Sequence, residues 1–305
     1  MAFDLVVLGC TGGPKENHLS AYLLCAQGRK EWITLDAGVL LGALEKAFEK
    51  GAFKEELFSD PTLTPLGEFF LHHIKAYLIS HAHIDHIAGL IANSTADISK
   101  PIFGIDSTID HLRDCIFNGH IWPNYGNEGV EPIGKYQYVR LPLASKRGIQ
   151  NTPYYVEAFQ LNHPKEYAST AFLVEYQDQY VLYCGDSSSD EQEEERRLEK
   201  IWHRIAPLIR EKKLRAILLE CSYPSLHAHK TVFGHLDTLS FMHEMCQLEH
   251  IAHSSLRGLK VVVTHRKESF RTRMDLPRMI EEELQAANHL GLQLIFPSQG
   301  ERIIL

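Results

Sequence analysis

The sequence has 305 residues, of which 44% are hydrophobic and 23% charged, with 20 glycines and 13 prolines. This composition is typical of globular proteins and excludes collagen-like, low-complexity and largely disordered chains. The formal net charge of −8 argues against a nucleic-acid polymer as partner, because such binding needs a basic surface. No apolar run approaches the ~20 residues of a membrane-spanning helix, so we expect no membrane association.

Apolar runs and helical periodicities alternate along the first half of the chain. The predicted strands there span residues 3–8, 20–25, 31–35, 74–80 and 101–104, and the predicted helices span residues 39–50, about 85 onward and 107–117. The first run has an acid at position 4 and no basic segment before it, which indicates a strand rather than an export signal. We therefore expect a cytoplasmic protein.

The second half of the chain contains further strands and three helical segments. The predicted strands span residues 136–141, 154–161, 170–176, 180–184, 214–220, 260–264, 292–295 and 301–305, and the predicted helices span residues 190–212, 235–247 and 276–290. The helix predicted from residue 190 opens with acidic residues, which favour a helix N-terminus. Because strands come in groups with helices between them, we expect an α/β (α+β) fold of two mixed sheets with outer helices, forming one domain over residues 1–305.

Histidine is unusually frequent, with 18 residues, and three of these crowd into residues 81–86, His-Ala-His-Ile-Asp-His. Without a cation, this many imidazoles would leave buried polar groups unpaired or place like charges side by side. At the end of a strand, His81 and His83 can share one direction, while the following turn directs Asp85 and His86 to a neighbouring point. The spacing therefore predicts ligands for two adjacent metal ions.

Three further ligand-type residues each follow a predicted strand. His163 follows residues 154–161, Asp186 follows residues 180–184, and His265 follows residues 260–264. Each residue alone is a weak signal, because single histidines are more often surface or structural residues. Together they repeat one pattern, since sheet scaffolds present sites on the loops at strand ends.

The order of these motifs resembles that of the metallo-β-lactamase superfamily of binuclear hydrolases. The segment HAHIDHIAGLIANS at residues 81–94 narrows the resemblance to the class II, yeast-type cyclic-nucleotide phosphodiesterases. Supporting segments fall in order from residue 8 to 301: LGCTGGPKEN, LDAG, FNGHIWPN, ECSYP, VFGHL, VTHRK and PSQGE. The chain departs from the family at Ile84, where Leu is usual, and around His163, where LNHP replaces Ser-His-Gly.

The resemblance implies a four-layer αββα sandwich and assigns the ligands to two divalent metal ions. One ion would be held by three histidines and the other by two histidines and an aspartate, with a second aspartate as the bridge: His81, His83 and His163; Asp85, His86 and His265; Asp186. Ligands of nitrogen and oxygen without thiolate favour zinc, with manganese or iron as alternatives. Such a pair lowers the pKa of a bound water. The implied reaction is attack of a metal-bound hydroxide on the phosphorus of cAMP, with cGMP as a second candidate, to give the 5′-monophosphate.

The departing 3′ oxygen needs a proton or a positive charge, and His235 in VFGHL is the expected donor. By resemblance, Glu220 in ECSYP would lie beside this imidazole, orient it and raise its pKa. The alternative is a histidine that only caps the start of a helix.

Trp122 and Asn124 are the candidates for holding the base, because an indole can stack on a purine and an amide offers a donor and an acceptor. A tryptophan in the core is an equally good interpretation. Asp36 and Gly38 are expected to support the metal ligands from behind.

Two other functions remain open on the same motifs. The site could serve another phosphodiesterase, such as a tRNA 3′-processing nuclease, or a lactonase or esterase; the nuclease would need a basic Gly-rich arm that the sequence lacks. A protein of a different class, a sensor that binds cyclic nucleotides without cleaving them, would not need the complete ligand set. The resemblance is also compatible with a homodimer.

Overall fold

A computed structural model describes residues 2–54, 58–164, 167–225, 234–270 and 273–305. The first two residues of the VFGHL segment, Val232 and Phe233, lie outside these ranges. None of the described helices is both long and apolar enough to cross a bilayer.

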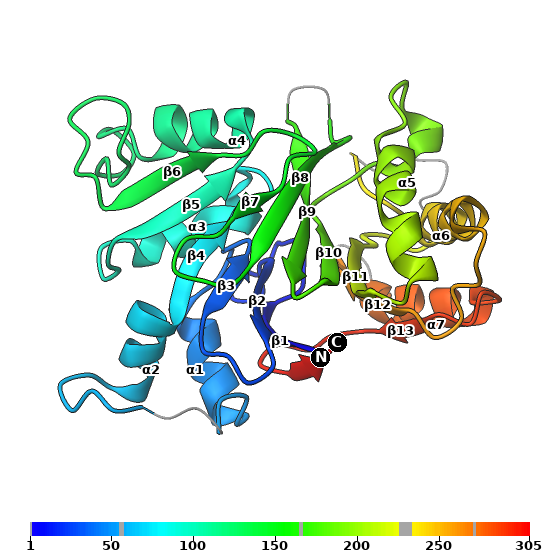
Figure 1. The fold of residues 1–305 in the computed structure, drawn as a ribbon, viewed down its shortest axis with the longest axis horizontal. Helices are drawn as coiled ribbons and strands as arrows, with labels where there is room; N and C mark the ends of the chain where they lie inside the picture. Colours follow the sequence, from blue (N-terminus) through cyan, green and yellow to red (C-terminus); the bar gives the residue numbers. More distant parts are fainter. Residues whose placement is uncertain (1, 55–57, 165–166, 226–233, 271–272) are drawn as a thin grey trace.

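The first sheet has seven strands in the order β14-β1-β2-β3-β4-β5-β6. Its strands are β1 Phe3–Gly9, β2 Ala21–Ala26, β3 Trp32–Leu35, β4 Ile74–Leu78, β5 Lys100–Gly104, β6 Tyr136–Arg140 and β14 Arg302–Ile304. In this order, the neighbouring strands from β14 through β1 and β2 to β3 pair antiparallel, and those from β3 through β4 and β5 to β6 pair parallel. The last strand therefore closes against the first, and the two termini lie close together (Figure 1).

The second sheet repeats this plan in the order β13-β12-β11-β10-β9-β8-β7. Its strands are β7 Arg147–Gly148, β8 Tyr155–Leu161, β9 Ser169–Tyr176, β10 Gln179–Cys184, β11 Leu214–Glu220, β12 Lys260–Thr264 and β13 Gln293–Ile295. Strands β7 to β10 pair antiparallel, and β10 to β13 pair parallel. Of these strands, only the two-residue β7 was not predicted from the sequence.

Helices cover the outer face of each sheet, as Figure 1 shows. Their bounds are α1 Leu41–Glu49, α2 Pro65–Glu68, α3 Ile84–Asn93, α4 Asp106–His111, α5 Arg197–Arg210, α6 Thr238–Ala252 and α7 Leu276–Ala287, with π-helical turns at Phe69–His73 and Leu112–Ile116 and a 3₁₀ turn at Asp190–Gln192. One apolar cluster lies between the sheets and two others lie between a sheet and its helices. This arrangement confirms the predicted four-layer sandwich.

Helix α5 begins at Arg197, so the prediction of a helix from residue 190 is wrong in its first turns. Asp190 instead lies in the 3₁₀ turn, and its carboxylate oxygens accept hydrogen bonds from the backbone N–H groups of Leu198 (3.1 Å) and Glu199 (2.7 Å). Free N–H groups at a helix start need such acceptors. The acidic run therefore supports the helix from outside it.

Helix α6 also begins later than predicted, at Thr238, with Asp237 accepting a hydrogen bond from the N–H of Ser240. His235 consequently lies in the loop before the helix and is free to face another part of the molecule. The predicted helix at residues 107–117 is continuous but changes from α4 to a π-helical turn at Leu112.

Candidate metal centre

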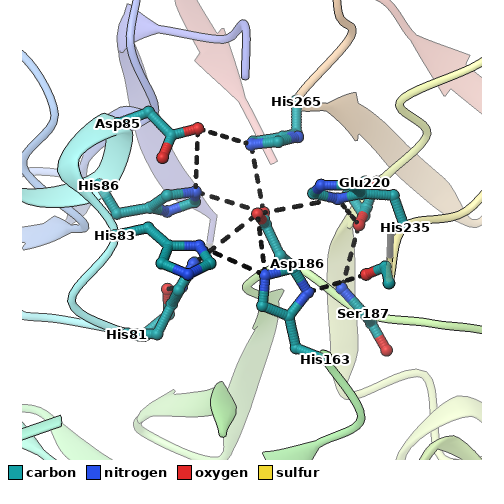
Figure 2. Close-up of polar contacts among 12 residues, drawn as sticks. His81, His83, Asp85, His86, His163, Asp186, Ser187, Glu220, His235 and His265 are labelled. Carbon is teal, nitrogen blue, oxygen red and sulfur yellow. Dashed lines mark hydrogen bonds and ion pairs between the residues drawn. The ribbon is translucent and has the colours of Figure 1, made fainter. Parts of the chain in front are cut away.

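Side chains from both sheets converge just beyond the ends of their strands (Figure 2). Strand β4 leads into His81 and His83, and the first turn of α3 carries Asp85 and His86. The remaining three follow strands of the second sheet: His163 after β8, Asp186 after β10 and His265 after β12. The structure thus brings all seven sequence-predicted metal ligands together.

The first group consists of His81, His83, His163 and Asp186, whose ligand atoms lie within 4.8 Å of one another. His163 Nε2 is 3.4 Å from His83 Nδ1. Asp186 Oδ2 lies 3.7 Å from His81 Nε2 and 3.9 Å from His163 Nε2. Three ring nitrogens and one carboxylate oxygen therefore face one point.

The second group consists of Asp85, His86 and His265. Asp85 Oδ2 lies 3.3 Å from His265 Nε2 and 3.9 Å from His86 Nε2. The other oxygen of Asp186, Oδ1, is 3.3 Å from Nε2 of both His86 and His265. Asp186 thus turns one oxygen to each group, which is the geometry of a bridging ligand.

Four of the imidazoles are held by a polar contact at Nδ1, which leaves Nε2 directed at the centre. The contacts are His81 with Ser80 Oγ (3.0 Å), His86 with Asp36 Oδ2 (2.7 Å), His163 with the carbonyl of Gly234 (2.8 Å) and His265 with Ser222 Oγ (2.9 Å). Such contacts fix the ring orientation that a metal ligand needs.

Asp36 organises the back of the centre, where it has an unusual positive φ of 55°. Besides contacting His86, its carboxylate accepts hydrogen bonds from the N–H and hydroxyl of Ser80 and from the hydroxyl of Tyr183. Gly38 follows closely, and a Cβ there would lie 2.2 Å from the carbonyl oxygen of Asp85. Both predicted support residues therefore lie directly behind the ligands.

The Gly-rich turn near the N-terminus has a role that the sequence did not indicate. A Cβ on Gly12 would lie 2.0 Å from Cε1 of His265. Only glycine leaves room for this imidazole, so the turn borders the second ligand group.

The charges of the cluster fit divalent cations. Burial lowers the pKa of His81 and His163, and that of His83 to about 4, so these rings are neutral near pH 7. Burial raises the pKa of Asp186, but the nearby imidazoles of His265 and His86 outweigh it and hold the pKa well below its usual value. Neutral imidazoles and ionised carboxylates are the forms that bind metals.

The pKa of His86 also indicates that the cluster favours a positive charge. Burial lowers its pKa, but the carboxylates of Asp186, Asp36 and Asp85 outweigh burial and raise the pKa well above the usual value. Within the described residues, Nε2 of His81 and Nε2 of His86 are buried without a hydrogen-bond partner. Buried nitrogens of this kind, directed at carboxylates, are best satisfied by a cation. The residues present therefore fit a metal centre.

His235 lies at the edge of the centre, in contact with Glu220 as predicted. Its Nδ1 is 2.8 Å from Glu220 Oε1 and 3.7 Å from Asp186 Oδ2. Glu220 also accepts hydrogen bonds from the N–H of Ser187 (3.0 Å) and the hydroxyl of Ser222 (2.6 Å). The carboxylate therefore holds the ring in one orientation.

The expectation that Glu220 raises the pKa of His235 is wrong. Burial lowers this pKa to about 4: the carboxylate of Asp186 acts to raise it and the positive charge of Lys267 to lower it, but burial is the largest effect. Lys267 Nζ lies 3.0 Å from His235 Nε2. A neutral ring fits both neighbours, because Nδ1–H can donate to Glu220 while Nε2 accepts from the ammonium group. Sequence reasoning missed Lys267, although it lies two residues after His265.

Trp122 and Asn124 are not brought into the cluster. The indole N–H of Trp122 donates to Ser94 Oγ (2.9 Å), just beyond the end of α3, roughly 12 Å along the helix from His86. Asn124 is buried and uses its amide within its own loop: it donates to the carbonyls of Glu128 and Val130 and accepts from the N–H of Gly126. These contacts shape the loop, and a role in binding a base stays a prediction.

Comparison with known proteins shows the family to which the chain belongs. A model of the class-II cAMP phosphodiesterases matches residues 4–300. The chain is 34% identical over 305 residues to a 3′,5′-cyclic-nucleotide phosphodiesterase of Aliivibrio fischeri, covering 99% of this chain and 92% of the relative. It is 33% identical over 306 residues to a probable 3′,5′-cyclic-nucleotide phosphodiesterase of Yersinia pestis, covering 98% and 88%.

Solved structures agree with the sequence relatives. Unliganded yeast PDE1 superposes with a TM-score of 0.86 at 26% identity, covering 100% of this chain and 99% of the other. The metallo-β-lactamase fold protein YhfI of Bacillus subtilis superposes with a TM-score of 0.63 at 17% identity, covering 100% of both chains, which supports the fold alone. The chain therefore belongs to the class-II cAMP phosphodiesterase family and has the metallo-β-lactamase fold.

Proposed function

We propose that this protein hydrolyses 3′,5′-cyclic nucleotides, cAMP first and cGMP second, to nucleoside 5′-monophosphates. The observation that carries the proposal is the convergence of all seven ligand-type side chains in a chain whose relatives are named 3′,5′-cyclic-nucleotide phosphodiesterases. We propose the whole chain, residues 1–305, as the functional unit, because β14 near its end pairs with β1 near its start.

The proposed cofactor is a pair of divalent ions, with Zn²⁺ favoured over manganese or iron by the nitrogen and oxygen donors. The proposed ligands of one ion are His81, His83 and His163, those of the other are Asp85, His86 and His265, and Asp186 is shared. When bound, two such ions activate water as a nucleophile and neutralise the charge of the phosphate. Asp85, whose side chain is 26% exposed, is proposed in addition as a hydrogen-bond acceptor at the site where the substrate reacts.

The residues beside the ions are proposed to serve the phosphate and the departing oxygen. Lys267 places its ammonium group at the edge of the centre, where it can bind a phosphate oxygen. His235 holds its proton at Nδ1 against Glu220 and presents Nε2 to Lys267. The pair therefore supplies charge and hydrogen bonding on one side of the phosphate, next to Asp186.

The surroundings proposed for this activity follow from the substrate. We propose the cytoplasm as the location of this activity. We also propose that no nucleic-acid polymer is a substrate, because the chain is acidic, and that two chains can pair as a homodimer.

A substrate panel distinguishes the proposal from its alternatives. Purified protein would be incubated separately with cAMP, cGMP, a short RNA with a 3′ trailer and a lactone, and the products would be separated by chromatography. We expect 5′-AMP from cAMP, a slower yield of 5′-GMP, and no product from the other two. Cleavage of the RNA or the lactone with cAMP intact would assign the site to the other hydrolases, and binding of cAMP without turnover would indicate a sensor.

A further inference from the structure

A cavity of about 530 Å³ opens directly beside the metal centre. His163, a proposed metal ligand, forms part of its wall, and the other lining residues include Tyr167, Ser107, the acidic residues 193–195 and Arg197. We call this cavity the Tyr167 pocket. The pocket therefore adjoins the ligand cluster at His163.

Tyr167 is the aromatic group of this pocket. Its ring centroid lies 4.8 Å from that of His83 and 6.1 Å from that of His111. The residue is nevertheless 44% exposed, so part of its ring surface is open. An aromatic ring held against a neighbour on one side offers a rigid, sequence-tolerant stacking surface to a base.

The charged groups of the pocket are mostly carboxylates, with Glu193, Glu194 and Glu195 against the single cation Arg197. Neither Glu193 nor Glu194 forms an ion pair or hydrogen bond through its side chain with another described residue, whereas Glu195 pairs with Arg197 (3.1 Å). Carboxylates accept hydrogen bonds from hydroxyl and amino groups but repel a phosphate. The cation Lys267 lies instead beside His235, whose ring centroid is 5.2 Å from that of His163.

This difference in charge defines a direction for the substrate. Its phosphate would be drawn to the metals and to Lys267, and its neutral part would lie away from them, toward the acidic wall. The neutral part of a cyclic nucleotide, its base and ribose, carries the aromatic face and the donor groups that match this wall.

We propose that the Tyr167 pocket binds the nucleoside part of the cyclic nucleotide, with the Tyr167 ring against the base and the carboxylates of Glu193 and Glu194 accepting from its hydroxyl or amino groups. This inference rests on the proposed phosphodiesterase function. It places the nucleoside at a site other than the Trp122 loop.

The test compares substrates with and without a nucleoside. Tyr167→Leu, Tyr167→Phe, Trp122→Leu and wild type would be assayed with cAMP and with bis(p-nitrophenyl) phosphate. Tyr155→Leu serves as a matched control, because Tyr155 is similarly exposed (47%) but lies in β8. We expect Tyr167→Leu to raise KM for cAMP roughly ten- to a hundredfold, as loss of a stacking platform does, with the aryl diester unaffected, and Tyr167→Phe to stay within about twofold of wild type.

A second measurement does not depend on turnover. Saturation-transfer NMR with adenosine, which lacks phosphate, should show base protons in contact with wild type and the Tyr155→Leu control, and at least a threefold weaker signal with Tyr167→Leu. The metal content of each variant would be measured alongside.

Two results would overturn the inference. The first is an equal loss on both substrates together with lost metal, because Tyr167 would then only hold His83 in place. The second is a KM effect at Trp122 and none at Tyr167. Failure of wild type to hydrolyse cAMP would instead count against the proposed function, and the adenosine signal would still report on the pocket.

Discussion

Asp186 makes the most contacts within the ligand cluster. Its two oxygens lie 3.3 to 3.9 Å from Nε2 of His81, His86, His163 and His265. We expect Asp186→Ala to lower the metal content by at least one ion per chain and to reduce kcat by about a thousandfold or more, because both ions lose a shared anionic ligand. Elemental analysis and steady-state kinetics would check this. Asp178→Ala, which removes an exposed carboxylate paired with Lys213, is the control; normal metal content in Asp186→Ala would contradict the assignment.

Substitution of Lys267 tests whether the reaction needs a cation at the edge of the centre. Replacing it with Met removes a charge 3.0 Å from His235 Nε2 and leaves the seven ligands intact. We expect kcat/KM for cAMP to fall roughly ten- to a hundredfold, the size of a lost charge-assisted hydrogen bond, with both metals retained. Lys267→Arg should recover part of the loss. If Lys267→Met matched wild type, the positive charge would have no role in the reaction.

At the scale of single residues, the sequence predicted which side chains converge and the supporting positions of Asp36 and Gly38, but not Lys267 or Tyr167. The proposed ligands were predictable because His163, Asp186 and His265 each follow a strand, while the other four crowd into residues 81–86 and match the family motif. Lys267 and Tyr167 were not, since their roles depend on contacts with His235 and His83 from other segments. The burial that lowers the pKa of His235 is likewise a property of the folded site.

Helix α3 carries two of the proposed ligands, and Gly89 allows the helix to pack closely against the backbone of residues 37–40. A Cβ on Gly89 would lie 2.7 to 2.8 Å from backbone atoms of Ala37, Val39 and Leu40. We expect Gly89→Ala to lower the free energy of unfolding by about 2 kcal/mol or more through overpacking, and to weaken metal binding. Urea denaturation and metal titration would measure the two effects.

Gly42 in α1 is the matched control, because nothing lies within 4 Å of a Cβ placed there. Alanine in this open helical position should increase stability by about 0.5–1 kcal/mol. Equal effects of the two substitutions would show that α3 does not need the close approach.

At the scale of elements, strands were more predictable than helix starts. Strands showed as buried apolar runs bounded by turns, and the predicted span of β11, residues 214–220, agrees with the structure at both ends. The predicted start of α5 was wrong because the acidic run was taken as the first turn of the helix on account of its charge. In the structure, Asp190 lies before the helix and caps it from there. Such a cap depends on how the turn folds back onto the helix start, and a local sequence pattern does not predict that.

The whole molecule holds the centre between its two sheets, so the metal should stabilise the fold. Ligands come from β4 and α3 on one side and from loops after β8, β10 and β12 on the other. Removing the ions with a chelator should lower the melting temperature by about 5 °C or more, because binding to the native state adds its free energy to folding. Calorimetry before and after zinc is restored would measure this, and an unchanged transition would contradict a centre shared by both sheets.

At this scale the sequence predicted the layers but not the order of strands. Grouped strands with helices between them indicate two mixed sheets. Pairing of β14 with β1 depends on contacts between residues near opposite ends of the chain. No pattern within a short window contains such contacts.

The central claim is that one chain holds two metal ions and uses them to hydrolyse cAMP. The most direct test is to remove the metal, restore zinc stepwise, and follow bound metal and 5′-AMP formation in the same samples. We predict that turnover rises with occupancy and reaches its plateau at two ions per chain, with 5′-AMP as the product. Full turnover with one ion, or cAMP left intact with two ions bound, would contradict the account.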